Sequence, residues 1–227
     1  MKRLYILILV FGIVGISSAQ KPFKKYPFKS GIIEYKMEGN AKGTQVLYWD
    51  EYGYREVSIE KSEAKIFGQT IVTNKTTLTL GSKLYEWSEG DTVIYESSNP
   101  IAETWEDGNY DEDDVEEFSL QTIESLGYEK TGSGMVVGKK CDIYDGLGKI
   151  WVWKGLSLRT EVKMLGVKTI IAAESIKTNT HVPGSVFKIP SGMRASKNVV
   201  EDNMQEEYEE EINPGEIKES FKSLFSN

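Results

Sequence analysis

The chain has 227 residues, of which 27 are lysine or arginine and 35 are aspartate or glutamate, so its formal net charge at pH 7 is −8. This acidic balance disfavours nucleic acid as a partner, because affinity for nucleic acid depends on cations that neutralise phosphates. It also weakens docking on anionic membrane surfaces. The length suffices for one domain with a sizeable core.

The first 19 residues have the pattern of a signal peptide. Lys2 and Arg3 precede an apolar run over residues 4–16, and the small residues 17–19 suit cleavage by signal peptidase. The next residue is Gln20, not the cysteine to which bacteria attach lipid. The sequence therefore predicts a periplasmic or secreted protein, and loss of the two basic signal residues leaves it with a net charge of −10.

The next region, from Gly31 to Ser97, consists of short alternating segments separated by Gly, Asn and Asp. Such spacing is typical of an antiparallel meander. The expected strands cover residues 32–38, 44–49, 54–60, 70–80, 83–87 and 92–96.

The middle of the chain changes character. Residues 103–117 contain nine acids, and apolar residues then recur with spacings of two, three and three, which predicts an amphipathic helix over about 114–126. A second set of strands follows. Its expected pieces cover residues 135–137, 141–144, 149–154, 156–164 and 167–177, with a last piece at 186–190.

The tail begins at residue 196. Seven acids lie between Glu201 and Glu211, and Asn213 then begins a pattern of helix start and apolar spacing up to Phe225. We therefore expect a domain over 20–195, followed at 196–227 by an acidic linker and a C-terminal amphipathic helix. That helix either packs on the domain or captures an envelope protein or a membrane.

Few residues could carry catalysis or bind a metal. Cys141 and His181 are the only cysteine and histidine, so the sequence predicts a buried thiol, a turn histidine and no internal disulfide. Residues 107–118 resemble a calcium loop, but Glu112 replaces its glycine and Phe118 its final glutamate. There is no nucleophile elbow, phosphate loop or dinucleotide fingerprint. We expect no catalytic residue, metal or cofactor.

The aromatic residues are the strongest candidates for a binding site. Trp151 and Trp153 share one face of a predicted strand while Ile150 and Val152 share the other, so both faces are apolar. One face belongs in a core, and the second needs a cover of helices or a hydrophobic ligand. The candidates for a hydrophobic cavity are Trp49, Tyr85, Trp87, Trp151 and Trp153.

Four segments carry a resemblance to a known family. They are residues 43–53, 138–144, 150–156 and 182–192. Together they resemble uncharacterised exported proteins of Bacteroidetes-type bacteria related to the LolA/LolB lipoprotein-carrier superfamily. The resemblance implies a mainly β, strongly curved antiparallel sheet, an incomplete barrel whose concave face is covered by helices. In that superfamily the cavity holds acyl chains of lipoproteins or other lipids.

Two functions follow as hypotheses. The leading one is a non-enzymatic periplasmic protein that binds a hydrophobic small molecule or lipid, in the handling of envelope lipid or lipoprotein. The alternative is a cell-envelope protein-interaction module with a filled core and no small-molecule ligand.

Overall fold

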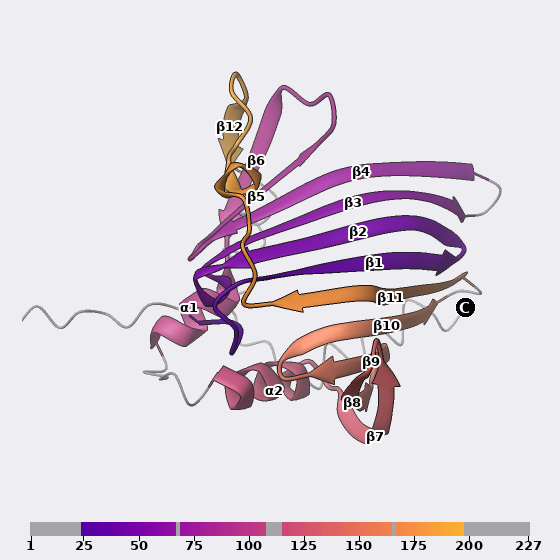
Figure 1. Cartoon of the computed structure of the whole chain (residues 1–227). Helices are drawn as coiled ribbons and strands as arrows, with labels where there is room; N and C mark the ends of the chain where they lie inside the picture. Colours follow the sequence, from indigo (N-terminus) through magenta and orange to yellow (C-terminus); the bar gives the residue numbers. More distant parts are fainter. Residues whose placement is uncertain (1–23, 67–68, 108–114, 165–166, 198–227) are drawn as a thin grey trace, which may run out of the picture.

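The computed structural model describes residues 24–66, 69–107, 115–164 and 167–197 (Figure 1). These residues form a sheet of twelve strands. The strands are β1 (Gly31–Gly39), β2 (Ala41–Asp50), β3 (Arg55–Ile66), β4 (Gln69–Leu80), β5 (Lys83–Ser88), β6 (Val93–Ser98), β7 (Glu129–Val136), β8 (Lys139–Asp145), β9 (Gly148–Trp153), β10 (Leu156–Met164), β11 (Val167–Thr178) and β12 (Arg194–Lys197).

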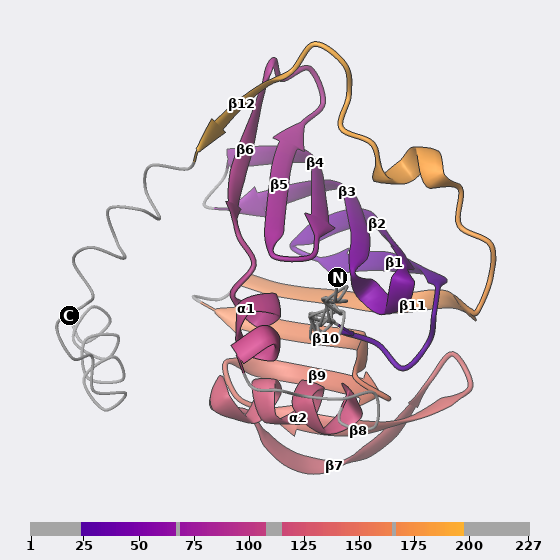
Figure 2. The ribbon, with the colours of Figure 1, turned by 90° about the vertical axis from the view of Figure 1, so that its left-hand side faces the viewer.

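The sheet is strongly curved and open, as the family resemblance implies. Its strand order is β12-β6-β5-β4-β3-β2-β1-β11-β10-β9-β8-β7, and Figures 1 and 2 show it bending into a half-barrel. Consecutive strands pair antiparallel from β1 to β6 and from β7 to β11, which confirms both predicted sets. Antiparallel pairing of β1 with β11 joins the two sets.

The turns explain much of the meander. Gly81, between β4 and β5, has a φ of +59°, and the ring of Tyr54 lies 2.7 Å from where a Cβ would stand. Only glycine adopts this conformation at low cost and leaves this space. Gly39, with a φ of +101°, plays the same part between β1 and β2.

Two α-helices lie on the inner side of the curve (Figure 2). Helix α2 (Val115–Ser125) confirms the predicted helix over about 114–126, whereas α1 (Pro100–Asp107) was not predicted from the sequence. The rings of Trp105 and Phe118 meet edge to face at 5.1 Å, so the helices bury a small cluster of their own.

The last predicted piece of strand, at 186–190, is wrong. Residues 179–193, here called the strap, run over the outer side of the sheet and contain a short 3₁₀ helix, η2 (Gly184–Phe187) (Figure 2). Pro183 and Pro190 lack the N–H groups that a strand ladder needs, which explains the difference. After the strap, β12 adds to β6 in parallel, a strand that the sequence did not predict.

The sheet buries apolar side chains on opposite faces in its two halves. The inner face carries a cluster built on β1, β2 and β8 to β11, with Ile33, Trp49 and Leu158 fully buried. Residues 24–30, here called the N-terminal segment, cover it with Tyr26 and Phe28. The outer face carries a second cluster on β3 to β5, which the strap covers with Val182 and Phe187.

Candidate functional site

The structure separates the five aromatic candidates into two groups. Trp49, Trp151 and Trp153 pack with the inner cluster, whereas Tyr85 and Trp87 pack with the outer cluster. Because the sheet lies between the two clusters, the five side chains do not surround a common space. A ligand would meet at most one of the two groups.

The indole of Trp49 is fully enclosed. Its Nε1 donates a hydrogen bond of 3.0 Å to the carbonyl of Phe28, and the ring of Tyr26 lies 5.2 Å away, centroid to centroid. On its other side, a Cβ at Gly31 would stand 2.2 Å from the indole. Trp49 therefore has the surroundings of a core residue.

Trp151 and Trp153 are also in contact with other side chains. Phe28 stacks on Trp153 at 5.1 Å, and the ammonium of Lys139 lies 4.7 Å from the centre of the same ring. The guanidinium of Arg159 lies 5.0 Å from the centre of the Trp151 ring. Neighbouring side chains therefore cover part of both indoles.

Polar contacts hold the N-terminal segment in place. The hydroxyl of Tyr26 donates a hydrogen bond of 2.6 Å to Glu56, and the Lys25 ammonium lies 2.9 Å from the same carboxylate. Burial and then the neighbouring Glu56 charge raise the pKa of Tyr26 well above its usual value. The same two causes raise the pKa of Tyr35, whose hydroxyl donates to the carbonyl of Ser157 at 2.8 Å. These contacts close the inner cluster.

Further along the inner face, β2 to β5 carry polar side chains that bond to one another. Gln45 donates to Ser58 at 2.8 Å, and Thr77 donates to Glu86 at 3.1 Å. An apolar ligand laid on this part of the face would cover polar groups without offering them partners, which costs free energy. The inner face therefore offers a poor surface to an acyl chain.

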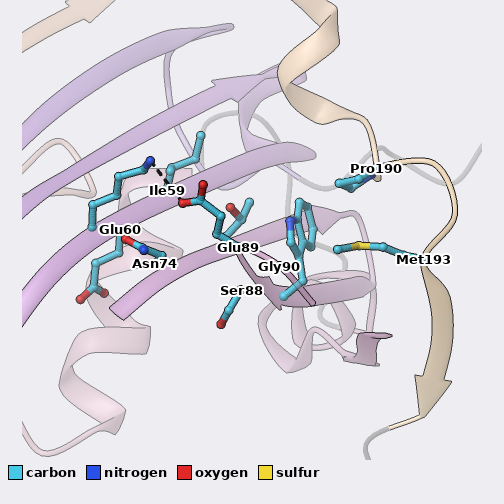
Figure 3. A pocket seen from close by; sticks show the side chains of 11 residues that line it. Ile59, Glu60, Asn74, Ser88, Glu89, Gly90, Pro190 and Met193 are labelled. Carbon is cyan, nitrogen blue, oxygen red and sulfur yellow. Dashed lines mark ion pairs between the residues drawn. The ribbon is translucent and has the colours of Figure 1, made fainter. Parts of the chain in front are cut away.

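The outer face has a cleft of about 490 Å³ between the sheet and the strap. Its walls include Ile59 of β3 and Trp87 of β5, and the strap contributes Pro190 and Met193. Figure 3 shows Pro190 and Met193 on one side of this space and Ile59, Asn74 and Glu89 on the other. The volume falls within the usual range for small-molecule sites, roughly 300–1,000 Å³.

The strand registers order the outer face from apolar to polar. Beneath the strap lies a row of apolar and aromatic residues, followed by a mixed row and then by a polar row. The rows are Ile32-Tyr48-Val57-Leu78-Tyr85, then Glu34-Val46-Ile59-Thr76-Trp87, then Lys36-Thr44-Lys61-Asn74. The cleft spans the second and third rows, so one end is apolar and the other polar.

A charged pair stands at the polar end of the cleft. The ammonium of Lys61 lies 3.7 Å from the carboxylate of Glu89, and the two side chains are 63% and 70% exposed (Figure 3). Such an exposed pair contributes little to folding stability, about 0–1 kcal/mol. Both charges remain accessible to a ligand.

Sequence reasoning found Trp87 but missed the rest of this cleft. Pro190 and Met193 lie more than 100 residues from Trp87 along the chain, and Pro190 was expected to end a strand at 186–190. The alternation of β3 places Ile59 and Lys61 on one face and could have drawn attention to them. Nothing in the sequence reveals that the strap crosses at that point.

A second hollow, of about 590 Å³, lies at the β1–β2 hairpin and is lined by Gly39, Asn40, Lys42, Gly43, Glu63 and Lys65. Its lining contains no large apolar side chain. It therefore offers no surface for a hydrophobic ligand.

The remaining candidates for chemistry lie apart. Cys141 is fully buried, as predicted, and burial raises the pKa of its thiol, while His181 is exposed on the strap. In the part of the chain that the structure describes, no three His, Cys, Asp or Glu side chains are grouped so that they could hold a metal ion. The acidic segment 107–118, whose sequence only partly resembles a calcium loop, falls mostly at 108–114, outside the described residues.

None of the described helices is long and apolar enough to cross a membrane. The predicted signal peptide, and nearly all of the acidic linker and C-terminal helix, lie outside the described residues.

Comparison with known proteins gives distant structural matches. No protein-family model matches the sequence, and no curated protein matches it. An uncharacterised conserved protein from Thermus thermophilus superposes with a TM-score of 0.46 at 7% identity, over 76% of this chain and 93% of that one.

Two further matches come from Pseudomonas aeruginosa and Mycobacterium bovis. MucB in the MucA/MucB complex of Pseudomonas aeruginosa has a TM-score of 0.42 at 10% identity, over 73% of this chain and 57% of that one. LprF from Mycobacterium bovis has a TM-score of 0.32 at 10% identity, over 74% and 90%. Because all of these TM-scores lie below 0.5, these likenesses carry no argument about function.

Proposed function

We propose that this chain is an exported, non-enzymatic binding protein that holds an apolar chain, such as the acyl chain of a lipid, in the cleft beside Trp87. The observation that carries the proposal is the position of Trp87. Its indole is only half-buried, in a cleft walled by Ile59, Pro190 and Met193. Burial of apolar surface contributes about 25 cal/mol per Å², before the costs of association.

The proposal assigns different roles to the five aromatic candidates. Trp87 contacts the ligand, and Tyr85 supports the apolar row beneath the strap. Trp49, Trp151 and Trp153 stabilise the inner cluster.

The resemblance to the LolA/LolB superfamily supports a lipid as the ligand, and the half-barrel agrees with that resemblance. The proposal departs from it in one respect. The acyl chain lies on the outer face under the strap, because the N-terminal segment covers the inner cluster and polar side chains on the inner face of β2 to β5 bond to one another. The proposal includes a cleaved signal peptide at 1–19, a domain at 20–195, a periplasmic or secreted location and a role in envelope lipid handling.

Native mass spectrometry of the mature protein, purified without detergent from a periplasmic preparation, tests the proposal. We expect an additional mass that disappears after organic extraction, or uptake of added fatty acid or phospholipid. Trp87→Ala should reduce this uptake, whereas Trp151→Ala, on the inner side, should not. A clean apo mass with no uptake of either lipid contradicts the proposal.

A second candidate is an envelope protein-interaction module, and the free edge of the sheet favours it. Strand β7 is the last in the strand order, and Met135 on it is 66% exposed. Exposed strand edges can pair with an extended segment of another protein. A pull-down with two variants tests this candidate. Loss of a captured partner on deletion of residues 213–227 would assign it to the tail, whereas loss in Met135→Lys would assign it to this edge.

A further inference from the structure

We propose that the cleft beside Trp87 selects a single-chain amphiphile with a zwitterionic head group, whose tail lies beneath the strap and whose head lies at the Lys61–Glu89 pair. This inference rests on the proposed function and specifies its ligand class. Its basis is the order of side chains along the outer face.

The direction of the ligand follows from the rows of the sheet. Ile59 of the sheet and Pro190 and Met193 of the strap form the apolar wall of the cleft. Lys61 and Asn74 belong to the polar row at the other end of the cleft. A tail placed at the apolar end avoids covering charges, and a head group at the other end keeps its contacts with water and charged side chains. The reverse orientation would bury the head group against the strap.

The head group must interact with two opposite charges. The 3.7 Å between Lys61 and Glu89 is longer than a hydrogen bond, and neither side chain makes a shorter polar contact within the described residues. A ligand phosphate can bind the ammonium of Lys61 while a ligand ammonium binds the carboxylate of Glu89. The ring of Trp87, two residues before Glu89, adds a favourable surface for a quaternary ammonium.

The other charge types fit less well. The side chains of Lys61 and Glu89 bring one positive and one negative charge to the cleft, because Glu60 pairs with Gln45 and points to the inner face, and the whole chain has a net charge of −8. An anionic head group meets repulsion from Glu89, and a purely cationic one meets repulsion from Lys61. A neutral alcohol meets no repulsion but gains no charge-assisted hydrogen bond.

A series of ligands with one tail tests the assignment by isothermal titration of the mature chain below micelle concentrations. The probes are dodecylphosphocholine, dodecanol, dodecanoate and dodecyltrimethylammonium. We expect dodecylphosphocholine to bind about fivefold tighter than dodecanol, with dodecanoate the weakest, as expected for two exposed charge contacts. Lys61→Met and Glu89→Gln should each remove most of this preference and leave dodecanol binding unchanged.

The pair formed by Lys83 and Glu96, at 2.8 Å, provides a control because its lysine is exposed like Lys61 and because the pair lies outside the cleft lining. Lys83→Met should leave all four affinities unchanged. Both lysines are more than half exposed, so neither substitution should unfold the protein.

The outcomes separate the two proposals. Equal binding of dodecanol and dodecylphosphocholine, lost in Trp87→Ala, overturns the zwitterion assignment and keeps the proposed function. Tightest binding of dodecanoate or dodecyltrimethylammonium also overturns the assignment. Failure of all four probes to bind overturns both proposals.

Discussion

Each of the two apolar clusters of this protein is covered by one segment of chain outside the main strands. The N-terminal segment covers the inner cluster more completely than the strap covers the outer cluster. The N-terminal segment closes the inner cluster with aromatic rings and with hydrogen bonds from Tyr26 and to Phe28. The strap closes the outer cluster with Val182 and Phe187, but leaves space beside Trp87. An apolar face thus becomes either a core or a candidate site according to how completely one covering segment fills it.

Trp49→Ala should have the largest effect, because it removes the largest fully buried side chain of the closed inner cluster. We expect a loss of about 3–5 kcal/mol in the free energy of unfolding, measured by urea denaturation. A loss below about 1 kcal/mol would show that the inner cluster is loosely packed, which contradicts the comparison.

Phe187→Ala should come second, because it removes a buried anchor of the strap whose ring lies 5.0 Å from the guanidinium of Arg55. We expect a loss of about 3 kcal/mol, since the strap can relax into part of the space. Lipid uptake should fall together with stability. Unchanged uptake in the folded variant would show that the strap does not form a wall of the site.

Tyr26→Phe should cost about 1.5–2 kcal/mol, because it removes a hydrogen bond to a charged carboxylate at the inner face. Tyr48→Phe is the matched control, since the hydroxyl of Tyr48 has no hydrogen-bond partner in the described part of the chain. Equal losses in the two variants would contradict the anchoring role of Tyr26.

The same tyrosines predict how stability depends on pH. The pKa values of Tyr26 and Tyr35 are raised in the folded protein, so above a pH of about 10 the unfolded chain releases protons that the folded chain retains. The free energy of unfolding that the protonated Tyr26 and Tyr35 contribute is fully present below that pH and is lost as the pH rises above it. The double variant Tyr26→Phe/Tyr35→Phe should show a shallower alkaline loss in denaturation midpoint than the parent.

Trp87→Ala should have the smallest effect on stability, about 1 kcal/mol, because its indole is only half-buried and borders the cleft. Its effect on lipid uptake should be large. A stability loss comparable to that of Trp49→Ala would make Trp87 a core residue and contradict the difference between the two clusters.

Local patterns in the sequence predicted most of the strands. The alternation in Gly31–Gly39 and the glycine turns at Gly39 and Gly81 depend on neighbouring residues, so they can be recognised without the fold. The same holds for α2, whose apolar spacing is local. Strand β12 has four residues and exists through its pairing with β6, so no local pattern marks it.

The sequence by itself determined the two sets of antiparallel strands, the burial of Cys141 and the aromatic residues that pack on the sheet, because each follows from the period of a strand and the burial of apolar surface. The curvature of the sheet was implied by the family resemblance. The tertiary structure alone decided which aromatic residue borders a cleft. The pairing of β1 with β11 joins the two sets of strands into one sheet with an inner and an outer face. The paths of the N-terminal segment and the strap determine how each face is covered. These contacts join residues that lie well apart in the sequence, and the period of a strand carries no information about them.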